Sequence, residues 1–364
     1  MYEVMKEWMN RYLSDEEPVV LAILILLTIT LFLALGTILT PIFISFVFAF
    51  VMQGAVKNLV KYHMPRGAAF YLTYVVFLFA TFGFFFFIVP RVWTQLENLV
   101  QELPNILLKG QALLLKLPEY YPDTVTGAQV QEWVDIINTE IAQFGQKILS
   151  ASISLIPLMA TISIYVLMVP ILVFFLLKDR DKLLGWFQSL LPQERKLIDL
   201  IGNEMNTQMA NYVRGKVVEI LIVGLVTFLL FRIFGLAYAT LLSLLVGLSV
   251  IIPYIGVMMV TVPVAIIAYV QFGWTPDLFY LMLGYTIIQA LDGLVLVPLL
   301  FSEIVNLHPV AIIVAIIVFG SLWGFWGVFF AIPLATFIKV LINAWPRNDQ
   351  SGSEVPVNPA ADGV

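Results

Sequence analysis

Charged residues are missing from four long stretches of the chain, and this pattern predicts membrane-spanning helices. Residues 18–56, 148–177, 233–276 and 304–338 contain no Asp, Glu, Lys or Arg. A bilayer core takes about 20 apolar residues per helix, so several of these stretches are long enough for two passes. The sequence therefore predicts an all-helical, polytopic membrane protein.

Pro and Gly residues divide these stretches, because Pro lacks a backbone N–H and tends to end a helix before it. The predicted full spans are about 18–35, 42–56, 67–89, 153–177, 217–235 and 278–302. Two further stretches, 236–272 and 309–341, are interrupted by SVIIPYIG (249–256) and GSLWGFWG (320–327). Their short pieces suit re-entrant hairpins or broken helices. We expect six full spans and two hairpins, or ten helices if the hairpins cross.

The distribution of basic residues in the loops predicts the orientation. Residues 57–66 contain three Lys or Arg and no acid, and KDRDK follows at 178–182. Short loops rich in Lys and Arg stay in the cytoplasm. The segment 91–147 has 4 basic and 7 acidic residues, which places it outside. Both termini are therefore expected in the cytoplasm.

Apolar residues recur with a period near 3.6 in three segments outside the predicted spans, 92–107, 130–148 and 197–213, which indicates amphipathic helices. Such stripes are usually packing surfaces or interfacial helices. The expected organisation is N-terminal spans 1–90, an extracytoplasmic helical region 91–147, span 4 with its cytoplasmic edge 148–182, cytoplasmic helices 183–216, C-terminal spans and hairpins 217–346, and a disordered tail 347–364.

Composition narrows the class of function. The chain of 364 residues is 61% hydrophobic and 12% charged, unlike soluble domains with about 25% charged residues. Net charge is −5 with no long basic tract, so nucleic acid is not an expected partner. The chain has no Cys and two His, and it lacks GxxxxGK[ST] and HExxH. We expect no metal centre, no cofactor, no nucleotide-driven pump and no enzyme.

Ionisable side chains inside predicted spans are the candidate functional residues. Asp292 lies midway in 278–302, and Gln289 precedes it by about one turn. An Asp at the centre of a spanning helix costs about 2.5–3.5 kcal/mol on insertion scales and usually faces a cavity or a partner. Asp292 is therefore either part of a transport pathway or a structural hydrogen-bond or salt-bridge anchor.

Glu219 is a second acid inside a predicted span. It follows Arg214 and Lys216 at the expected cytoplasmic edge, which favours a boundary ion pair over a pathway role. The PYIG segment offers a different feature, since Pro253 and Gly256 either expose backbone groups to a cavity or form a structural turn.

A third group of polar residues lies where a long span meets the last hairpin. SEIVNLHP (302–309) contains Glu303, Asn306 and His308. A lone His is usually structural, but together with Asp292 this cluster could form a polar path.

Three long segments carry a family resemblance: NYVRGKVVEILIVG (211–224), SVIIPYIG (249–256) and the stretch from IIQALDG to FIKVL (287–341). They resemble the autoinducer-2 exporter family, and within it the PerM-type permeases. The likeness runs over about 1–346. The family pattern covers Pro253, Tyr254, Gly256, Gln289, Asp292, Pro298, Asn306, His308 and Pro309.

The resemblance implies a bacterial inner-membrane protein, a homo-pentamer, and secondary transport of a small solute with an elevator-like motion. Some members are assigned to autoinducer-2, others to sodium/proton exchange, and many have no assigned substrate. We therefore expect a permease or exporter of a small polar solute, with an autoinducer-2-like molecule as one candidate. The alternatives are a sodium/proton antiporter, in which Asp292 or Glu219 binds the ion, and a membrane scaffold that binds other proteins.

Overall fold

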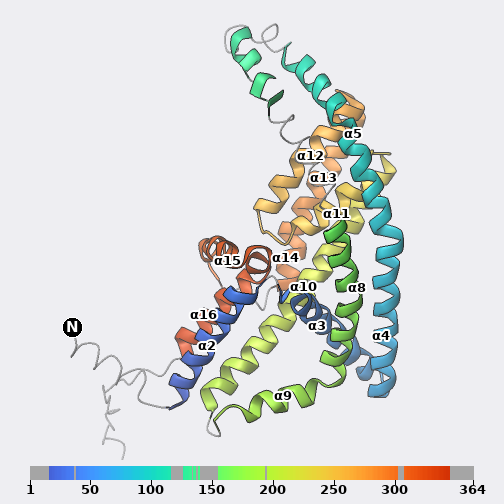
Figure 1. Ribbon diagram of the computed structural model, residues 1–364. Helices are drawn as coiled ribbons and strands as arrows, with labels where there is room; N and C mark the ends of the chain where they lie inside the picture. The colour runs from blue at the N-terminus through green and yellow to red at the C-terminus, as the bar shows by residue number, and fades with distance from the viewer. Residues whose placement is uncertain are drawn as a thin grey trace, which may run out of the picture.

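Figure 1 shows the computed structural model, in which every regular element of the described residues is helical and none is a strand. This confirms the predicted all-helical class. The structure describes residues 16–36, 38–115, 126–132, 134–136, 138–139, 155–192, 195–301 and 307–344. The predicted tail at 347–364 lies outside these ranges.

The helices and helical turns below have defined bounds in the described residues. In chain order they are α2 (Glu16–Leu35), α3 (Thr40–Lys61), α4 (Arg66–Gly83), the π-helical turn η1 (Phe84–Ile88), α5 (Val89–Leu114), α8 (Leu155–Lys178), α9 (Arg180–Ser189), α10 (Lys196–Ile233), α11 (Ala239–Ser249), α12 (Ile255–Phe272), α13 (Pro276–Leu291), the π-helical turn η2 (Asp292–Leu296), α14 (Val297–Phe301), α15 (Pro309–Phe329) and α16 (Ala331–Ala344).

Six apolar helical segments in the described part of the chain are long enough to cross a membrane. They are Thr40–Lys61, Arg66–Gln111, Thr161–Lys178, Ile255–Phe272, Pro276–Phe301 and Pro309–Phe329. Six spans were also predicted, but two of them differ. The predicted spans 18–35 and 217–235 are not among these six segments, and Ile255–Phe272 and Pro309–Phe329, from the predicted hairpins, are. The arms of the predicted hairpins are unequal, with 11 and 18 residues in α11 and α12 and 21 and 14 in α15 and α16. One arm of each hairpin therefore reaches spanning length.

The predicted end of the third span at Pro90 is wrong, because the helix continues from α4 through η1 into α5. The π-helical turn Phe84–Ile88 directly precedes Pro90. A proline ring clashes with the carbonyl four residues earlier in a regular helix, and a wider π turn relieves this clash. The same arrangement recurs before Pro298, which follows the π-helical turn Asp292–Leu296.

The long helix α10 joins the two halves of the C-terminal core. Its 38 residues extend over about 57 Å at 1.5 Å per residue. One apolar cluster packs α10 against α11, α12 and α13 through buried residues such as Phe231, Val246, Val264 and Tyr285. A second cluster packs α10 against α15 and α16. Every element that approaches the candidate site below is therefore anchored on α10.

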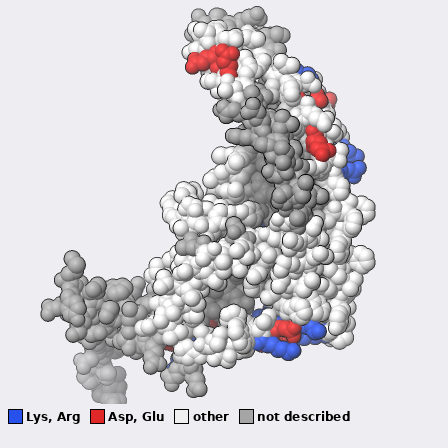
Figure 2. Space-filling view, viewed as in Figure 1, with Lys and Arg blue, Asp and Glu red and all other residues white. Residues whose placement is uncertain are grey.

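Charged side chains gather at the two ends of the molecule in Figure 2, and the surface between them carries few charges. An ion pair joins Arg66, at the start of α4, to Asp181 in α9, and the side-chain N and O atoms lie 3.4 Å apart. Burying a charge in hydrocarbon is costly, so an uncharged band between two charged ends is typical of a membrane-spanning protein.

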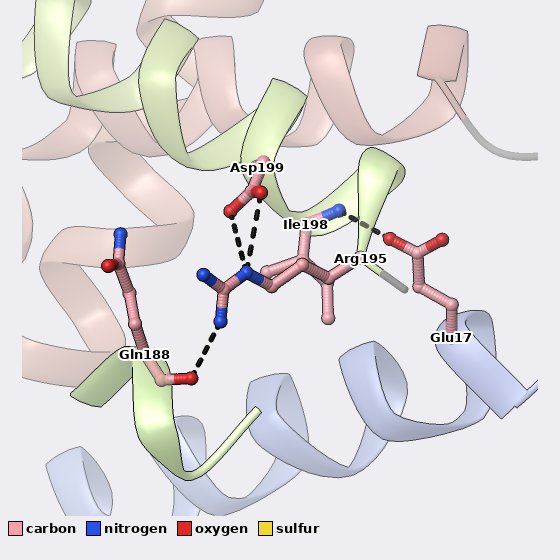
Figure 3. A network of polar contacts seen from close by, with 5 residues as sticks. All are labelled: Glu17, Gln188, Arg195, Ile198 and Asp199. Carbon is pink, nitrogen blue, oxygen red and sulfur yellow. Dashed lines mark hydrogen bonds and ion pairs between the residues drawn. The ribbon is translucent and has the colours of Figure 1, made fainter. Parts of the chain in front are cut away.

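The start of α10 is held by contacts from α2 and α9 (Figure 3). The Glu17 carboxylate accepts a hydrogen bond from the Ile198 backbone N–H at 2.9 Å. Arg195 pairs with Asp199 and also donates to the backbone carbonyl of Gln188 at 2.6 Å. Glu17 therefore caps α10 from a different helix and fixes α2 against it.

Replacing Glu17 by Ala is expected to lower the free energy of unfolding by about 1 kcal/mol, because an N–H in the first turn of α10 loses its acceptor. Glu17→Gln is the matched control, since its amide oxygen still accepts this hydrogen bond. Thermal unfolding of the purified protein in detergent measures both. Equal midpoints for Glu17→Ala and the wild type would contradict the capping role.

Candidate functional site

A buried ion pair on α10 is the centre of the candidate site. Lys216 and Glu219 lie one turn apart and are 3% and 2% exposed. Lys216 Nζ lies 2.7 Å from Glu219 Oε2. Charges at this depth are tolerated only when they are paired and hydrogen-bonded. The ion pair predicted for Glu219 is therefore present, with Lys216 as its partner, and both side chains are buried in the protein.

Lys216 also contacts the break between α11 and α12. Its ammonium donates a hydrogen bond to the Val250 carbonyl at 3.0 Å and lies 5.1 Å from the centre of the Phe301 ring. Val250 is the C-cap residue directly after α11, at the end of the helix where backbone carbonyls lack partners within the helix. Lys216 thus joins α10, the first hairpin and α14.

The turn that exposes this carbonyl depends on PYIG. Tyr254 has a φ of 65°, a left-handed conformation that is rare outside glycine. Gly256 packs so closely on α11 that a Cβ atom there would lie 1.8 Å from the Ser249 carbonyl oxygen. Pro253 and Gly256 therefore form a tight structural turn, and this turn also presents a backbone carbonyl to the site.

The second hairpin is held in a similar way one turn earlier on α10. The Tyr212 hydroxyl donates to the Phe329 carbonyl at 2.8 Å, at the end of α15. The predicted interruption at 320–327 is confirmed by Gly324, which has a φ of 58° inside α15. Tyr212 and Lys216 are four residues apart, so one face of α10 binds the broken ends of both hairpins.

Asp292 belongs to the π-helical turn η2, which packs against α10, the helix of the ion pair. Its side chain is 7% exposed. Among the described residues, nothing hydrogen-bonds Asp292 Oδ1 or either side-chain amide atom of Gln289, and all three atoms are buried. Gln289 and Asp292 are three residues apart and share a helix face. Unpaired buried polar atoms each cost about 1–3 kcal/mol, which marks them as candidate ligand contacts.

We refer to Lys216, Glu219, Gln289 and Asp292 as the polar site. Sequence reasoning found its three members other than Lys216. The Lys216–Glu219 spacing of three residues could have indicated a pair, but not that the pair is buried.

The predicted cluster at 302–309 is described only in part. His308 is exposed, and its Nδ1 accepts a hydrogen bond from the Val310 backbone N–H at 3.3 Å, which caps α15. Glu303 and Asn306 lie outside the described residues. The described ranges contain no group of three or more His, Asp or Glu side chains that could hold a metal ion.

A separate apolar cavity of about 580 Å³ lies between α2, α3, α15 and α16. Its walls include Leu24, Phe46, Phe50, Trp326 and Phe337. No member of the polar site lines this cavity. The cavity therefore suits apolar groups and is separate from the polar site.

Comparison with known proteins identifies the chain. The family model described as "AI-2E family transporter" matches residues 21–347. The chain belongs to the AI-2E family of transporters. This confirms the resemblance seen in the sequence and places the protein among multi-pass membrane transporters rather than enzymes.

Relatives of this AI-2E family transporter have names that leave the solute undefined. The "Putative permease PerM" of Escherichia coli (strain K12) is 39% identical over 346 residues, 95% of this chain and 98% of PerM. The "Putative transport protein YueF" of Bacillus subtilis is 27% identical over 317 residues, 84% of this chain and 83% of YueF. The "Putative transport protein YrrI" of Bacillus subtilis is 26% identical over 337 residues, 89% of this chain and 94% of YrrI.

Proposed function

We propose that this AI-2E family transporter moves a small polar solute across the bacterial inner membrane by secondary transport, and that the solute binds at the polar site. The observation that carries the proposal is the set of unpaired buried atoms on Asp292 and Gln289 beside the Lys216–Glu219 ion pair. An intramembrane carboxylate is costly, and such residues typically mark solute or ion pathways.

The hydrogen-bonding capacity of these atoms defines the class of solute. Asp292 Oδ1 accepts hydrogen bonds when ionised, whereas the Gln289 amide both donates and accepts. A ligand that satisfies them carries donors and acceptors on a compact frame, as hydroxylated small molecules do. An autoinducer-2-like solute is one candidate that the family resemblance supplies.

The elements around the polar site provide a route for movement. Each hairpin end is bound to α10 by one hydrogen bond, from Lys216 and from Tyr212. Broken helices with bound solute between them are typical of transporters, in which one bundle moves against another. The proposed cycle moves the hairpins relative to α10, with both termini in the cytoplasm and, by family resemblance, five copies in the assembly.

A sodium/proton antiporter is the second candidate. It is favoured by two buried carboxylates, Glu219 and Asp292, since hard cations prefer oxygen ligands. Proton movement in proteoliposomes on addition of sodium would support this alternative, whereas flux of a neutral polar solute without sodium would support the first proposal.

Replacing Asp292 by Asn is expected to reduce solute flux at least tenfold, about 1.4 kcal/mol of lost interaction, because the amide cannot accept hydrogen bonds on both terminal atoms. Proteoliposomes loaded with autoinducer-2, and then with other small hydroxylated solutes, give the initial rate. Asp277→Asn is the matched control, since Asp277 is an exposed acid in the first turn of the same helix. If the wild type moves a solute and Asp292→Asn moves it equally fast, Asp292 has no part in transport.

A further inference from the structure

Lys216 occupies an unusual position for a lysine in a membrane transporter. Its ammonium is buried between a carboxylate at 2.7 Å and a backbone carbonyl at 3.0 Å, with an aromatic ring on a third side at 5.1 Å. Asp292 is buried in η2, which packs against α10. Oxygen atoms from α10 and from the end of α11 therefore contact one positive charge.

In broken-helix transporters, oxygen atoms at helix ends bind cations in a similar way. Carbonyls at the C-terminal end of a half-helix carry partial negative charge, and unwound backbone there coordinates sodium or protons in several transporter folds. In this structure Val250 directly follows α11, and its carbonyl oxygen accepts a hydrogen bond from the Lys216 ammonium.

We infer that the Lys216 ammonium is a tethered cation, which stands at the position that a bound alkali ion would otherwise take in the polar site. The Glu219 carboxylate contacts this position, and Lys216 supplies the positive charge that pairs with it. The transporter therefore binds its solute without an alkali ion at the Val250 carbonyl. The inference rests on the polar site of the proposed function and adds the reason why that site excludes sodium and potassium.

Alkali-ion binding to the purified protein in detergent tests this inference. Thermal unfolding is measured in chlorides of sodium, potassium, lithium and choline at one pH and one ionic strength. The wild type should show the same midpoint in all four salts. Lys216→Gln keeps a donor for the Val250 carbonyl but removes the charge, so alkali ions should raise its midpoint relative to choline. At ten times the dissociation constant, the expected rise is about 3–6 °C.

Two matched variants separate charge from structure. Lys216→Arg keeps the positive charge and should stay insensitive to alkali ions. Lys216→Gln combined with Glu219→Gln restores the formal charge of the wild-type site, because one positive and one negative group are both removed, and should also be insensitive. Sensitivity in Lys216→Gln alone supports the inference.

Chemical restoration of the ammonium provides an independent measurement, because the chain contains no cysteine. In Lys216→Cys, the thiolate reacts with 2-aminoethyl methanethiosulfonate to form a disulfide that carries an ammonium, and methanesulfinate leaves. Alkali sensitivity should disappear after this treatment but persist after methyl methanethiosulfonate, which adds a neutral group.

Three results would overturn the inference: a wild-type midpoint that rises with sodium or potassium over choline, a folded Lys216→Gln that ignores alkali ions, or no difference between the two thiol reagents once mass spectrometry shows that each has modified the introduced thiol. These readouts measure cation binding and not flux. If Asp292→Asn transports normally while the salt series behaves as expected, the transport proposal fails and the tethered cation stands.

Discussion

Removal of only one member of the Lys216–Glu219 pair is expected to lower the free energy of unfolding by about 3–5 kcal/mol. In Lys216→Met, the Glu219 carboxylate stays 2% exposed and loses the ammonium at 2.7 Å. The Val250 carbonyl loses its donor in the same variant. A buried charge without a partner costs far more than the pair contributes, because desolvation is no longer offset.

The double variant Lys216→Met with Glu219→Leu decides whether charge isolation is the cause. A buried ion pair replaced by apolar residues of similar volume is often neutral in stability, so the double variant should be more stable than Lys216→Met alone. Titration with a denaturing detergent, followed by loss of helical circular dichroism, measures all three proteins. If the double variant is as unstable as the single one, packing and not charge explains the loss.

An exposed ion pair at the start of α10 gives a reference value for the loss in free energy of unfolding. Asp199 is half exposed and pairs with Arg195 four residues earlier. Asp199→Asn should cost about 0.3–0.5 kcal/mol, as exposed helix pairs do. The tenfold difference expected between these two ion pairs follows from the burial of Lys216 and Glu219 and from the additional hydrogen bond of Lys216 to the Val250 carbonyl.

Burial of Lys216 could not be predicted from the sequence, whereas the position of Asp292 could. Asp292 stands alone in a long apolar segment, so its neighbours in the chain reveal the conflict with the membrane. Lys216 lies at the edge of an apolar segment, where lysine ordinarily extends to the interface. Its burial depends on the α11–α12 break and on Phe301, which lie 34 and 85 residues further along the chain.

The helix breaks could likewise be predicted from the sequence at some positions and not at others. Glycine and proline marked both hairpin breaks, and the left-handed Gly324 confirms one of them. Pro90 was misinterpreted, because a π-helical turn lets the helix pass through it. The hydropathy pattern fixes which segments are apolar, but the choice between a break and a continuous helix depends on local hydrogen bonding that a single proline does not determine.

Replacing Gly256 by Ala is expected to cost more than about 4 kcal/mol, the range reached only when a substitution damages the core or backbone. The new Cβ would lie 1.8 Å from the Ser249 carbonyl oxygen and 2.7 Å from its carbon. Both are backbone atoms, so no side chain can move aside. α11 must separate from α12 at the turn that presents the Val250 carbonyl to Lys216.

Gly83→Ala is the matched control for this substitution. Gly83 has helical backbone angles, and a Cβ there would have no neighbour within 4 Å among the described residues. It should be neutral or stabilise the protein by about 0.4–1 kcal/mol, because alanine restricts the unfolded chain. Thermal midpoints and the yield of monodisperse protein measure both variants.

Thermal unfolding in the four chloride salts also tests whether Gly256→Ala changes the polar site. If enough Gly256→Ala folds to be measured, displacement of the Val250 carbonyl leaves the Lys216–Glu219 pair in place, because that pair lies within α10. Gly256→Ala should therefore lose stability without gaining the alkali-ion sensitivity expected of Lys216→Gln. A Gly256→Ala protein with the midpoint of the wild type would show that α11 and α12 do not approach as closely as the turn requires.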